Sequence, residues 1–300
     1  MAVQVSGRMP TGISSLDPVL DGGIPPGSVV LLEGEIGAGS QEFVYTSLIY
    51  LSMLRQRQDS APGARIPDRI SYVTFTRMKE DILSEIALSF SPALAQNVNG
   101  TLAFSDLSTN YFDSSVVPSD WYSPREGAAA TREKNGAQDR MLSDLSGHVA
   151  FGRKNTILKL LYLTLSLATE KAKGGSGCSL IVIDSLTDLA TQYSEPERWR
   201  ELTAFLRGLQ RVTKTWDSTI YLLLTKGVLE PSREKEIADC VDAVALFKWE
   251  ETAAQRRQRT MFFEKFRGVM PHLEERDLVK FAVRISPGSG FEVSNIRVVV

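Results

Sequence analysis

The stretch "PTGISSLDPVLDGGIPPGSVVLLEGEIGAGSQEF", residues 10–43, decides the fold of this chain. Within it, "VVLLEG" (29–34) is a short apolar run that ends in glycine, which predicts a buried strand. A glycine-rich loop follows. The next residues, "QEFVYTSLIYLSMLRQRQ" (41–58), place Phe43, Ser47, Tyr50 and Leu54 on one face of a predicted helix. The order is therefore strand, glycine loop and helix.

The glycine loop fits most of the phosphate-loop pattern G-x-x-x-x-G-K-[ST]. Gly34 and Gly39 are its two fixed glycines, and Gly37 adds backbone freedom that lets N–H groups turn toward a phosphate. The lysine that would reach the β- and γ-phosphates is replaced by Ser40, and the hydroxyl that would hold Mg²⁺ by Gln41. Taken alone, the loop fits a phosphate site and a plain strand-to-helix turn equally well.

The composition is that of an ordinary globular protein, with 300 residues, 43% hydrophobic residues and a net charge of −2. This charge does not favour nucleic acid as a partner. The isolated residues Cys178, Cys240, His148 and His272 do not predict a zinc site, and the cysteines are interpreted as buried thiols. We find no signal peptide and no apolar run of the roughly 20 residues that span a bilayer, so we expect a soluble, cytoplasmic protein.

Helices and strands alternate along most of the chain, which predicts a parallel α/β core. The central strand "SLIVID" ends in Asp184. From residue 241 onward, apolar and polar residues alternate as in antiparallel strands, so we expect an antiparallel extension and a single domain over 1–300. Two further predicted helices cover about 14–20 and 155–173.

The segment from about 108 to 148 differs in character. It is rich in Ser, Gly, Asp and Pro and has no clear period, and a loop of this length is unusual inside a domain. We interpret it as a mobile insertion with a helical turn near 140–145. Trp121 and Tyr122 indicate that part of it docks on another surface.

The entry segment resembles that of the KaiC family, a branch of the RecA-type P-loop ATPases, in which T-G-[IF]-x-x-L-D-x-x-L-x-G-G-[IL]-P-x-G precedes the phosphate loop. The matching residues are Thr11, Gly12, Ile13, Leu16, Asp17, Leu20, Gly22, Gly23, Ile24, Pro25 and Gly27. The resemblance continues in register through most of the chain outside 108–148. It implies a RecA-like P-loop NTPase fold with core strand order 5-1-4-3-2.

Later segments carry the same resemblance. "LIVIDSLTDL" resembles the Walker B strand, so Asp184 corresponds to the aspartate associated with Mg²⁺, should the metal bind at all. "YLLLT" resembles the strand that ends in a polar sensor, here Thr225, which Lys226 follows. "FEKFRG" resembles the K-x-R-G element that reaches the nucleotide of a neighbouring subunit, with Lys265 and Arg267 at the matching positions.

The chain departs from the family where chemistry is carried out. Thr76 and Arg77 stand where active relatives have two glutamates at the end of the second strand, one of which orients the attacking water. Loss of such a base removes typically about 10²–10⁴ in rate. Together with Ser40 and Gln41, these changes predict that no catalytic residue set is intact and that ATP is not hydrolysed.

Two hypotheses account for the altered charges. In the first, which we favour, Arg77 forms an ion pair with Asp184 and fills the metal position, because an unpaired, partly buried carboxylate is costly. In the second, Arg77 or Lys226 replaces the missing lysine and holds an anion without Mg²⁺. For Lys265 and Arg267, a contact across a subunit boundary and a solvent-exposed strand face remain alternatives.

The resemblance implies an inactivated ATPase relative of a kind often archaeal and linked to signal transduction. We expect a regulatory interaction module that binds a protein partner or a KaiC-like subunit, as a monomer or dimer rather than a hexamer. No cofactor is expected, and ATP with Mg²⁺ belongs to the alternative. That alternative is an ATP-binding KaiC-like ATPase with an atypical loop; DNA binding is disfavoured by the charge.

Overall fold

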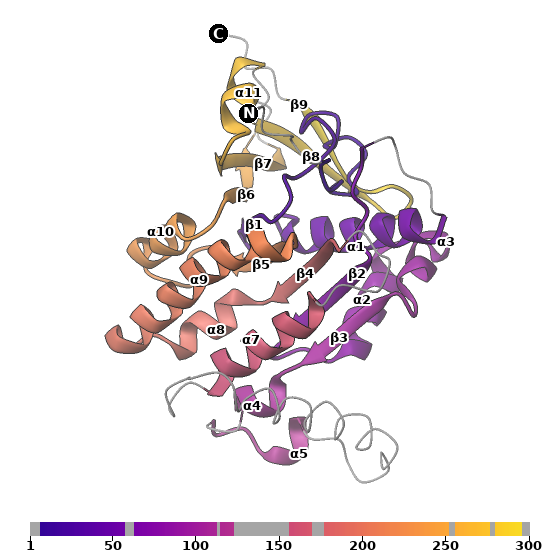
Figure 1. Cartoon of the computed structure of the whole chain (residues 1–300). Coiled ribbons are helices and arrows are strands. Elements are labelled where there is room, and N and C mark those ends of the chain that lie inside the picture. Colours follow the sequence, from indigo (N-terminus) through magenta and orange to yellow (C-terminus); the bar gives the residue numbers. More distant parts are fainter. Residues whose placement is uncertain are drawn as a thin grey trace.

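The computed structural model describes residues 7–57, 63–112, 115–122, 156–169, 177–251, 256–276 and 280–295 (Figure 1). Its strands are β1 (Val29–Gly34), β2 (Arg69–Thr74), β3 (Leu102–Asp106), β4 (Ser179–Asp184), β5 (Thr219–Thr225), β6 (Ala243–Glu251), β7 (Arg257–Phe266), β8 (Lys280–Ser286) and β9 (Gly290–Asn295). The helices are α1 (Ser40–Arg57), α2 (Lys79–Ser89), α3 (Pro92–Ala95), α4 (Ser108–Phe112), α5 (Ser119–Tyr122), α7 (Thr156–Ala168), α8 (Leu186–Gln192), α9 (Pro196–Trp216), α10 (Pro231–Asp239) and α11 (Met270–Glu275), with a 3₁₀ turn at Gln96–Val98.

The nine strands of the described residues form one sheet in the order β3-β2-β4-β5-β1-β6-β7-β8-β9. The pairs from β3 to β6 are parallel, and those from β6 to β9 are antiparallel. Numbered along the chain without β3, the parallel core reads 5-1-4-3-2, so the predicted order is confirmed, and β3 is an additional edge strand. The antiparallel extension is also confirmed.

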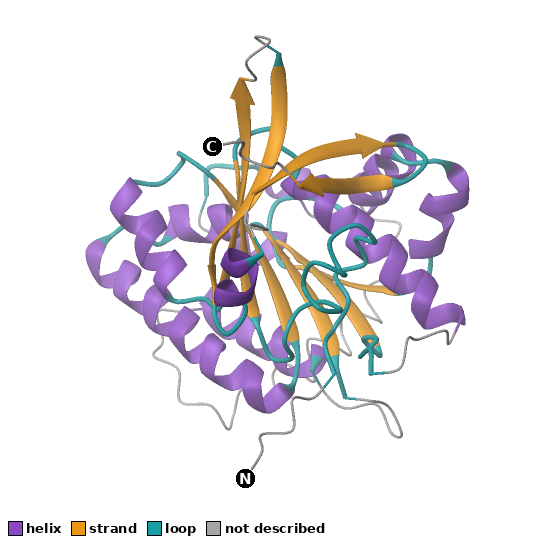
Figure 2. Cartoon of the chain, turned by 90° about the horizontal axis from the view of Figure 1, so that it is seen from above, coloured by secondary structure: helices purple, strands orange, loops and turns teal. Residues whose placement is uncertain are grey.

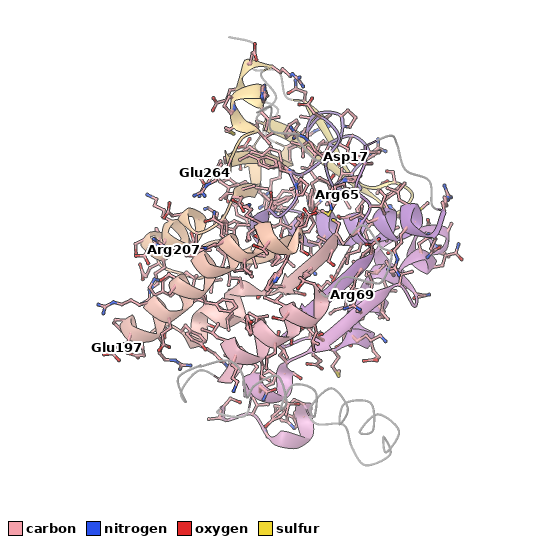
Figure 3. All side chains as sticks on the ribbon, viewed as in Figure 1. Asp17, Arg65, Arg69, Glu197, Arg207 and Glu264 are labelled. Atoms are coloured by element: carbon pink, nitrogen blue, oxygen red, sulfur yellow. The ribbon has the colours of Figure 1, made fainter. Side chains whose placement is uncertain are left out.

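Helices cover both faces of the parallel core, as Figure 2 shows. Successive side chains of a strand point to opposite faces. Val30 and Leu32 of β1 therefore pack with α1, whereas Val29 and Leu31 pack with the cluster under α7, α8 and α9. This two-sided burial explains why the core strands are continuously apolar. Charged side chains such as Glu197 and Arg207 of α9 stand outside these layers (Figure 3).

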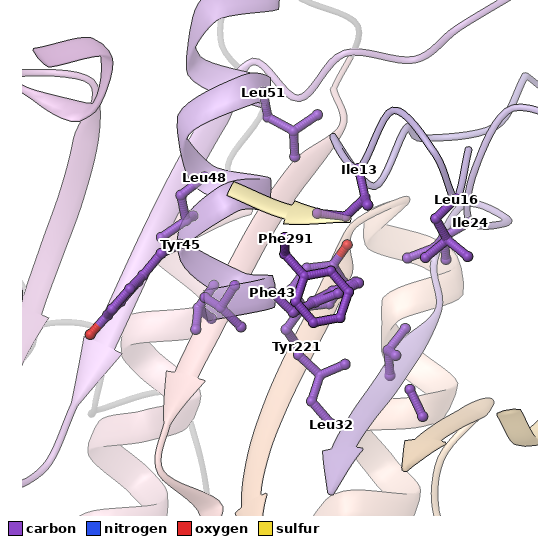
Figure 4. Close-up of a cluster of buried hydrophobic side chains, with 14 of the residues drawn as sticks. Ile13, Leu16, Ile24, Leu32, Phe43, Tyr45, Leu48, Leu51, Tyr221 and Phe291 are labelled. Atoms are coloured by element: carbon purple, nitrogen blue, oxygen red, sulfur yellow. The ribbon is translucent and has the colours of Figure 1, made fainter. Parts of the chain in front are cut away.

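The N-terminal segment packs over the start of α1. Ile13, Leu16 and Ile24 are buried and join Phe43 of α1 and Phe291 of β9 in one cluster (Figure 4). The predicted helix at 14–20 is wrong, because these residues form a series of turns. Its local order comes instead from the carboxylate of Asp17, which accepts hydrogen bonds from the backbone N–H groups and hydroxyl at residues 11 and 12.

The predicted insertion at 108–148 is described only at 108–112 and 115–122. Here the structure differs from a structureless loop, because the chain forms α4 and α5. Tyr111 packs against the core beside Phe75, and its carbonyl accepts a hydrogen bond of 2.8 Å from Gln192. The predicted turn at 140–145 lies outside the described residues. Trp121 has 75% of its side chain exposed, so the docking predicted for it stays a prediction.

The structure also shows the extent of one predicted helix and the burial of several single residues. The helix expected at 155–173 is α7 over its described part, and Cys178 and Cys240 are buried free thiols. Burial raises the pKa of the Cys178 thiol to about 11. Trp199 is buried, and its ring N–H donates to Glu236 at 2.5 Å. Within the described residues, no helix combines the length and the apolar character needed to cross a membrane.

Candidate functional site

The sequence-predicted site residues gather at the carboxyl ends of four parallel strands. Gly34 ends β1 and pairs with Thr225, which ends β5. Asp184 ends β4 and pairs with Thr74, which ends β2. Thr76 and Arg77 follow β2 rather than lying on it, and Lys226 follows β5. This edge is where open α/β sheets bind their ligands.

The glycine loop keeps the backbone shape that its glycines permit. Gly37 and Gly39 have φ values of 73° and 111°, which side-chain-bearing residues rarely adopt. A Cβ atom on Gly34 would lie 2.6 Å from Ser40 Oγ, and one on Gly39 would lie 3.2 Å from both Ile285 Cδ1 and Phe291 Cε2. The loop and α1 thus pack directly on each other and on the antiparallel extension.

The β6–β7 hairpin holds the loop from its other side. The ring N–H of Trp249 donates to the Ile36 carbonyl at 3.2 Å, and Arg259 Nε donates to the Gly37 carbonyl at 2.9 Å. The Glu35 carboxylate accepts the backbone N–H of Trp249 at 3.0 Å. Gly34 and Gly39 are therefore required by packing in the protein itself, and Gly37 by its backbone conformation, whether or not a phosphate binds.

Asp184 is the centre of a hydrogen-bonded network. One of its oxygens, Oδ2, accepts a bond of 2.6 Å from the Tyr72 hydroxyl, lies 3.3 Å from Arg77 Nη1 and lies 3.5 Å from Gln41 Nε2. Gln41 Nε2 also donates to the Tyr72 hydroxyl oxygen at 3.1 Å. Burial raises the pKa of the Asp184 carboxyl, while the bond from Tyr72 and the charge of Arg77 lower it in part.

Arg77 connects Asp184 to α2 and α1. Its Nη1 donates to the Tyr45 hydroxyl at 3.1 Å, and its Nη2 forms an ion pair with Glu85, which also accepts a bond of 2.8 Å from Tyr45. Burial lowers the pKa of the Arg77 guanidinium, but its contacts with Tyr45, Glu85 and Asp184 leave that pKa above the ordinary value. The ion pair of Arg77 with Asp184 that the first hypothesis requires is present.

Two tyrosines complete this network as neutral donors. Burial raises the pKa of Tyr72 well above its ordinary value, and burial likewise raises the pKa of Tyr45. Both hydroxyls therefore keep their protons at neutral pH and donate to Asp184 and Glu85. The network comprises Gln41, Tyr45, Tyr72, Arg77, Glu85 and Asp184, and we call it the Asp184 network.

Thr76 lies beside the Asp184 network, but its hydroxyl forms a hydrogen bond outside that network. Its hydroxyl donates to Asp188 Oδ2 at 3.3 Å, and the same carboxylate oxygen accepts from Ser185 Oγ at 2.8 Å. Ser185 also caps α8 by accepting the backbone N–H of Asp188 at 3.2 Å. A threonine hydroxyl cannot serve as a general base near neutral pH, so Thr76 does not restore what a glutamate would supply.

Lys226 is held by two buried carboxylates. It forms an ion pair with Glu33 of β1 and lies 3.9 Å from Glu234 of α10. Burial lowers the pKa of the Lys226 ammonium, but the two glutamates leave that pKa above its ordinary value. Thr225 is positioned by its backbone N–H, which donates to Thr187 Oγ1 at 2.8 Å. The second hypothesis would require Lys226 to leave these partners.

Lys265 and Arg267 lie away from the other predicted residues. Residue 266 pairs with Ala243, the first residue of β6, so these cations sit at the amino-terminal edge of the parallel core. Lys265 Nζ donates to the last carbonyls of α10, at 2.8 Å to Ala238 and 3.0 Å to Asp239. Burial, with the nearby charge of Arg267, lowers the pKa of Lys265. Arg267 is exposed.

Two further kinds of site, a metal site and a cavity, were considered among the described residues. Among the described residues, no group of three or more His, Cys, Asp or Glu side chains could hold a metal ion. A cavity of about 350 Å³ opens at the amino-terminal ends of β2, β3 and β4, on the opposite edge of the sheet from the glycine loop. Arg55 and Arg69 line it, but each donates to a backbone carbonyl.

Several functional neighbours were missed from the sequence. Tyr45, Tyr72 and Glu85 belong to the Asp184 network, and Trp249 with Arg259 hold the loop. Glu33 could have been found from the sequence, because it is the single charged residue in the otherwise apolar strand "VVLLEG" and therefore needs a cationic partner such as Lys226. For Tyr45, Tyr72 and Glu85 no such signal exists, because tyrosines in apolar segments and glutamates on helices are ordinary.

Comparison with known proteins supports the fold. A sequence family described as "Family of unknown function (DUF7125)" matches residues 8–61, which include the entry segment, β1, the glycine loop and α1. No curated protein matches the chain. Among solved structures, a KaiC-like protein from the hyperthermophilic archaeon Pyrococcus horikoshii OT3 superposes with a TM-score of 0.54 at 18% identity, covering 96% of this chain and 98% of that chain. The chain therefore has a KaiC-like, RecA-type fold.

Proposed function

We propose that this protein does not hydrolyse ATP and acts as a regulatory or signal-transduction interaction module on a KaiC-like scaffold. The observation that carries the proposal is the contact of Arg77 Nη1 with Asp184 Oδ2 at 3.3 Å. It places a permanent cation against the carboxylate that would associate with Mg²⁺. Mg²⁺ demands close octahedral oxygen ligands at about 2.0–2.1 Å, and a guanidinium beside the carboxylate opposes its entry.

Displacing Arg77 would be costly because its partners lie on three other elements, α1, α2 and β4. Its departure would leave Glu85 and Asp184 without their shared cation and would remove the bond to Tyr45. Charge-assisted hydrogen bonds contribute about 1.5–3 kcal/mol each in proteins. A nucleotide would have to offset that loss before gaining any Mg²⁺ contact of its own.

The environment of Lys226 supports the same proposal. A phosphate-binding lysine must present its charge to the ligand, whereas this ammonium faces the buried Glu33 and Glu234. Phosphoryl transfer depends on positioned cations and a positioned base. Ser40, Gln41 and Thr76 supply neither, so the residues around the loop favour a retained scaffold over retained catalysis.

The shape of the loop, with positive φ values at Gly37 and Gly39, favours one second candidate, an ATP-binding KaiC-like ATPase with an atypical loop. α1 begins at Ser40, and the first N–H groups of a helix have no intrahelical acceptor, so they are able to face an anion. In this candidate Arg77 or Lys226 turns away from its carboxylates and replaces the lysine.

Calorimetric titration of the full chain with ATP, ADP and phosphate, with and without Mg²⁺, distinguishes the proposed interaction module from the ATP-binding candidate. The proposal predicts no binding heat and an unchanged melting temperature, whereas a ligand at about 100 times its Kd would stabilise the fold by about 2.7 kcal/mol. Tight, Mg²⁺-dependent ATP binding contradicts the proposal. Mg²⁺-independent binding that is lost in either Arg77→Ala or Lys226→Met supports the second candidate.

We further propose a protein partner or a KaiC-like subunit as the binding partner, with a monomer or dimer as the free state. In this proposal no nucleotide lies between subunits to stabilise a ring. Light scattering on a sizing column, with and without ATP, measures the assembly directly. A hexamer, or a hexamer formed only with ATP, contradicts this part.

A further inference from the structure

The β6–β7 hairpin carries a group of arginines that the Asp184 network does not use. Trp249 lies opposite Arg259 in the antiparallel register, and Arg257 lies two residues from Arg259 on the same face of β7. We call Trp249, Arg257 and Arg259 the arginine face. The hairpin extends beyond the helices that flank the core (Figure 2), and the Arg257 side chain is exposed on it.

The arginine face is pre-ordered by contacts with an aromatic ring and with a backbone carbonyl of the glycine loop. The guanidinium carbons of Arg257 and Arg259 lie 4.8 and 4.5 Å from the centre of the Trp249 ring. Arg259 Nε is anchored on the Gly37 carbonyl, so its two terminal nitrogens remain for another acceptor. Among the described residues, neither arginine forms an ion pair with a carboxylate, although Glu250 of the same hairpin pairs with Lys280 at 2.7 Å.

An apolar residue borders the same face. The carbonyl of Ile36 accepts the ring N–H of Trp249 at 3.2 Å, which places the tip of the glycine loop against the tryptophan. The Ile36 side chain is 85% exposed. Cations held in fixed positions beside an exposed aliphatic side chain form a mixed surface, and arginine guanidinium groups pair with carboxylates in bidentate geometry.

From this arrangement we propose that the arginine face, with Ile36, binds an acidic peptide segment of a partner protein. The chain as a whole has a net charge of −2, and two guanidinium groups held together on one tryptophan ring would steer an acidic segment to this place. The proposal extends the interaction role proposed above by naming the surface and the chemistry of the partner.

The contacts favour an acidic peptide over nucleic acid. Single-stranded nucleic acids are bound by stacking bases on aromatic rings, and the Trp249 ring is already covered by two guanidinium groups. Proteins that bind DNA electrostatically often contact about 6–10 phosphates, which exceeds what two arginines offer.

The test uses fluorescence anisotropy of the full chain with a labelled peptide of about eight glutamates, a length that spans a strand at about 3.3 Å per residue. An oligothymidylate of equal charge and a lysine peptide of equal length are titrated in parallel. We expect the glutamate peptide alone to bind at low salt, and its affinity to fall as salt shortens the Debye length to about 8 Å.

Arg257→Glu should weaken the affinity for the glutamate peptide by at least about tenfold, because the substitution reverses one of the two positive charges. Arg257→Lys keeps the charge and should bind the peptide with an affinity between those of the parent and Arg257→Glu. Arg200→Glu changes the net charge equally on the exposed face of α9 and should leave affinity unchanged. Equal thermal unfolding of the variants shows that they fold.

Three outcomes overturn the inference: no preference for the glutamate over the lysine peptide, equal effects of Arg257→Glu and Arg200→Glu, or tighter binding of the oligothymidylate. The last would make nucleic acid the partner. Failure here is separate from failure of the proposed function, because the nucleotide titrations probe the Asp184 network and the peptide titrations probe the hairpin.

Discussion

Arg77 Nη1 lies 3.3 Å from Asp184 Oδ2, where the carboxyl ends of β2 and β4 lie side by side. The Asp184 side chain is 8% exposed and that of Arg77 is 30% exposed, so the pair is partly shielded from water. A positively charged side chain thus lies directly beside the Asp184 carboxylate. Within the Asp184 network, the single guanidinium of Arg77 faces the two carboxylates of Asp184 and Glu85.

Removal of the Arg77 side chain should destabilise the protein. Arg77→Ala leaves Asp184 and Glu85 without their shared cation, and we expect a loss of about 1–3 kcal/mol, below the range for a fully buried pair because Arg77 is partly exposed. Urea denaturation measures the free energy of unfolding. Arg207→Ala breaks the exposed pair with Asp239 and should lower the free energy of unfolding much less than Arg77→Ala does. Equal losses would show that the Arg77 pair contributes no more than a surface contact.

Rebuilding the phosphate loop alone should not rebuild a nucleotide site. Ser40→Lys with Gln41→Thr restores the pattern, but Arg77 still faces Asp184. We therefore expect Mg²⁺-ATP affinity in this double variant to be at least about tenfold weaker than in the triple variant that adds Arg77→Ala. Calorimetry on the two variants compares them, after thermal unfolding has shown that both fold. Equal affinities would mean that Arg77 does not obstruct the metal position.

The pH dependence of stability should report on Asp184. Burial raises the pKa of its carboxyl above the ordinary 3.8, so the folded state holds this proton more tightly than the unfolded state does. That contribution is fully present below pH 3.8 and is lost as the pH rises through the folded-state pKa. The free energy of unfolding of Asp184→Asn, minus that of the parent, should therefore increase as the pH rises above 3.8.

Urea denaturation at a series of pH values provides this difference. Asp239→Asn, which removes an exposed carboxylate, is the control for net charge. A difference that falls with rising pH, or one that Asp239→Asn reproduces, would contradict the assignment.

The two glycines inside the loop should differ in their sensitivity to alanine. At Gly39 the φ of 111° is strained for alanine, and the new Cβ would meet Ile285 and Phe291 at 3.2 Å, so we expect a loss of about 2–4 kcal/mol. At Gly37 the nearest atom is Trp249 Nε1 at 4.0 Å, and backbone strain alone should cost about 1 kcal/mol. Unfolding without any nucleotide is the measurement, and a larger loss at Gly37 would argue against a packing role for Gly39.

Lys226 should contribute to stability through its buried partners. Lys226→Met leaves Glu33 and Glu234 without a cation, and we expect a loss of about 2–4 kcal/mol, since Lys226 itself is partly exposed. Lys235→Met removes an exposed lysine from α10 and should change stability by less than about 0.5 kcal/mol. If both variants unfold alike in urea, the Lys226 charge is available for another role.

Much of the fold could be predicted because it depends on local patterns. The apolar runs that contain Leu32, Val182 and Leu223 define buried strands, and the helical period after Gly39 defines α1. The segment at 14–20 was predicted wrongly for a physical reason. Its order comes from the Asp17 carboxylate and from burial of Ile13 and Leu16 against α1, and a helical spacing of apolar residues is satisfied equally by successive turns.

The candidate site could be predicted only in part. The positions of Ser40, Gln41, Thr76, Arg77 and Asp184 follow from motif spacing, and so does their arrival at one edge of the sheet. The partners of these side chains do not follow from motif spacing. Lys226 was a candidate anion ligand in the sequence, and only the fold shows Glu33 and Glu234 beside it.

By itself, the sequence determined the RecA-type fold, because strand burial and helix period are local properties. Only the tertiary structure decided which acceptors the charged side chain of Arg77 contacts. Arg77 is flexible enough to reach several acceptors, and it is the packing of α1, α2, β2 and β4 that brings Tyr45, Glu85 and Asp184 within its reach. Side-chain pairing depends on distances between elements remote in sequence, which no local pattern encodes.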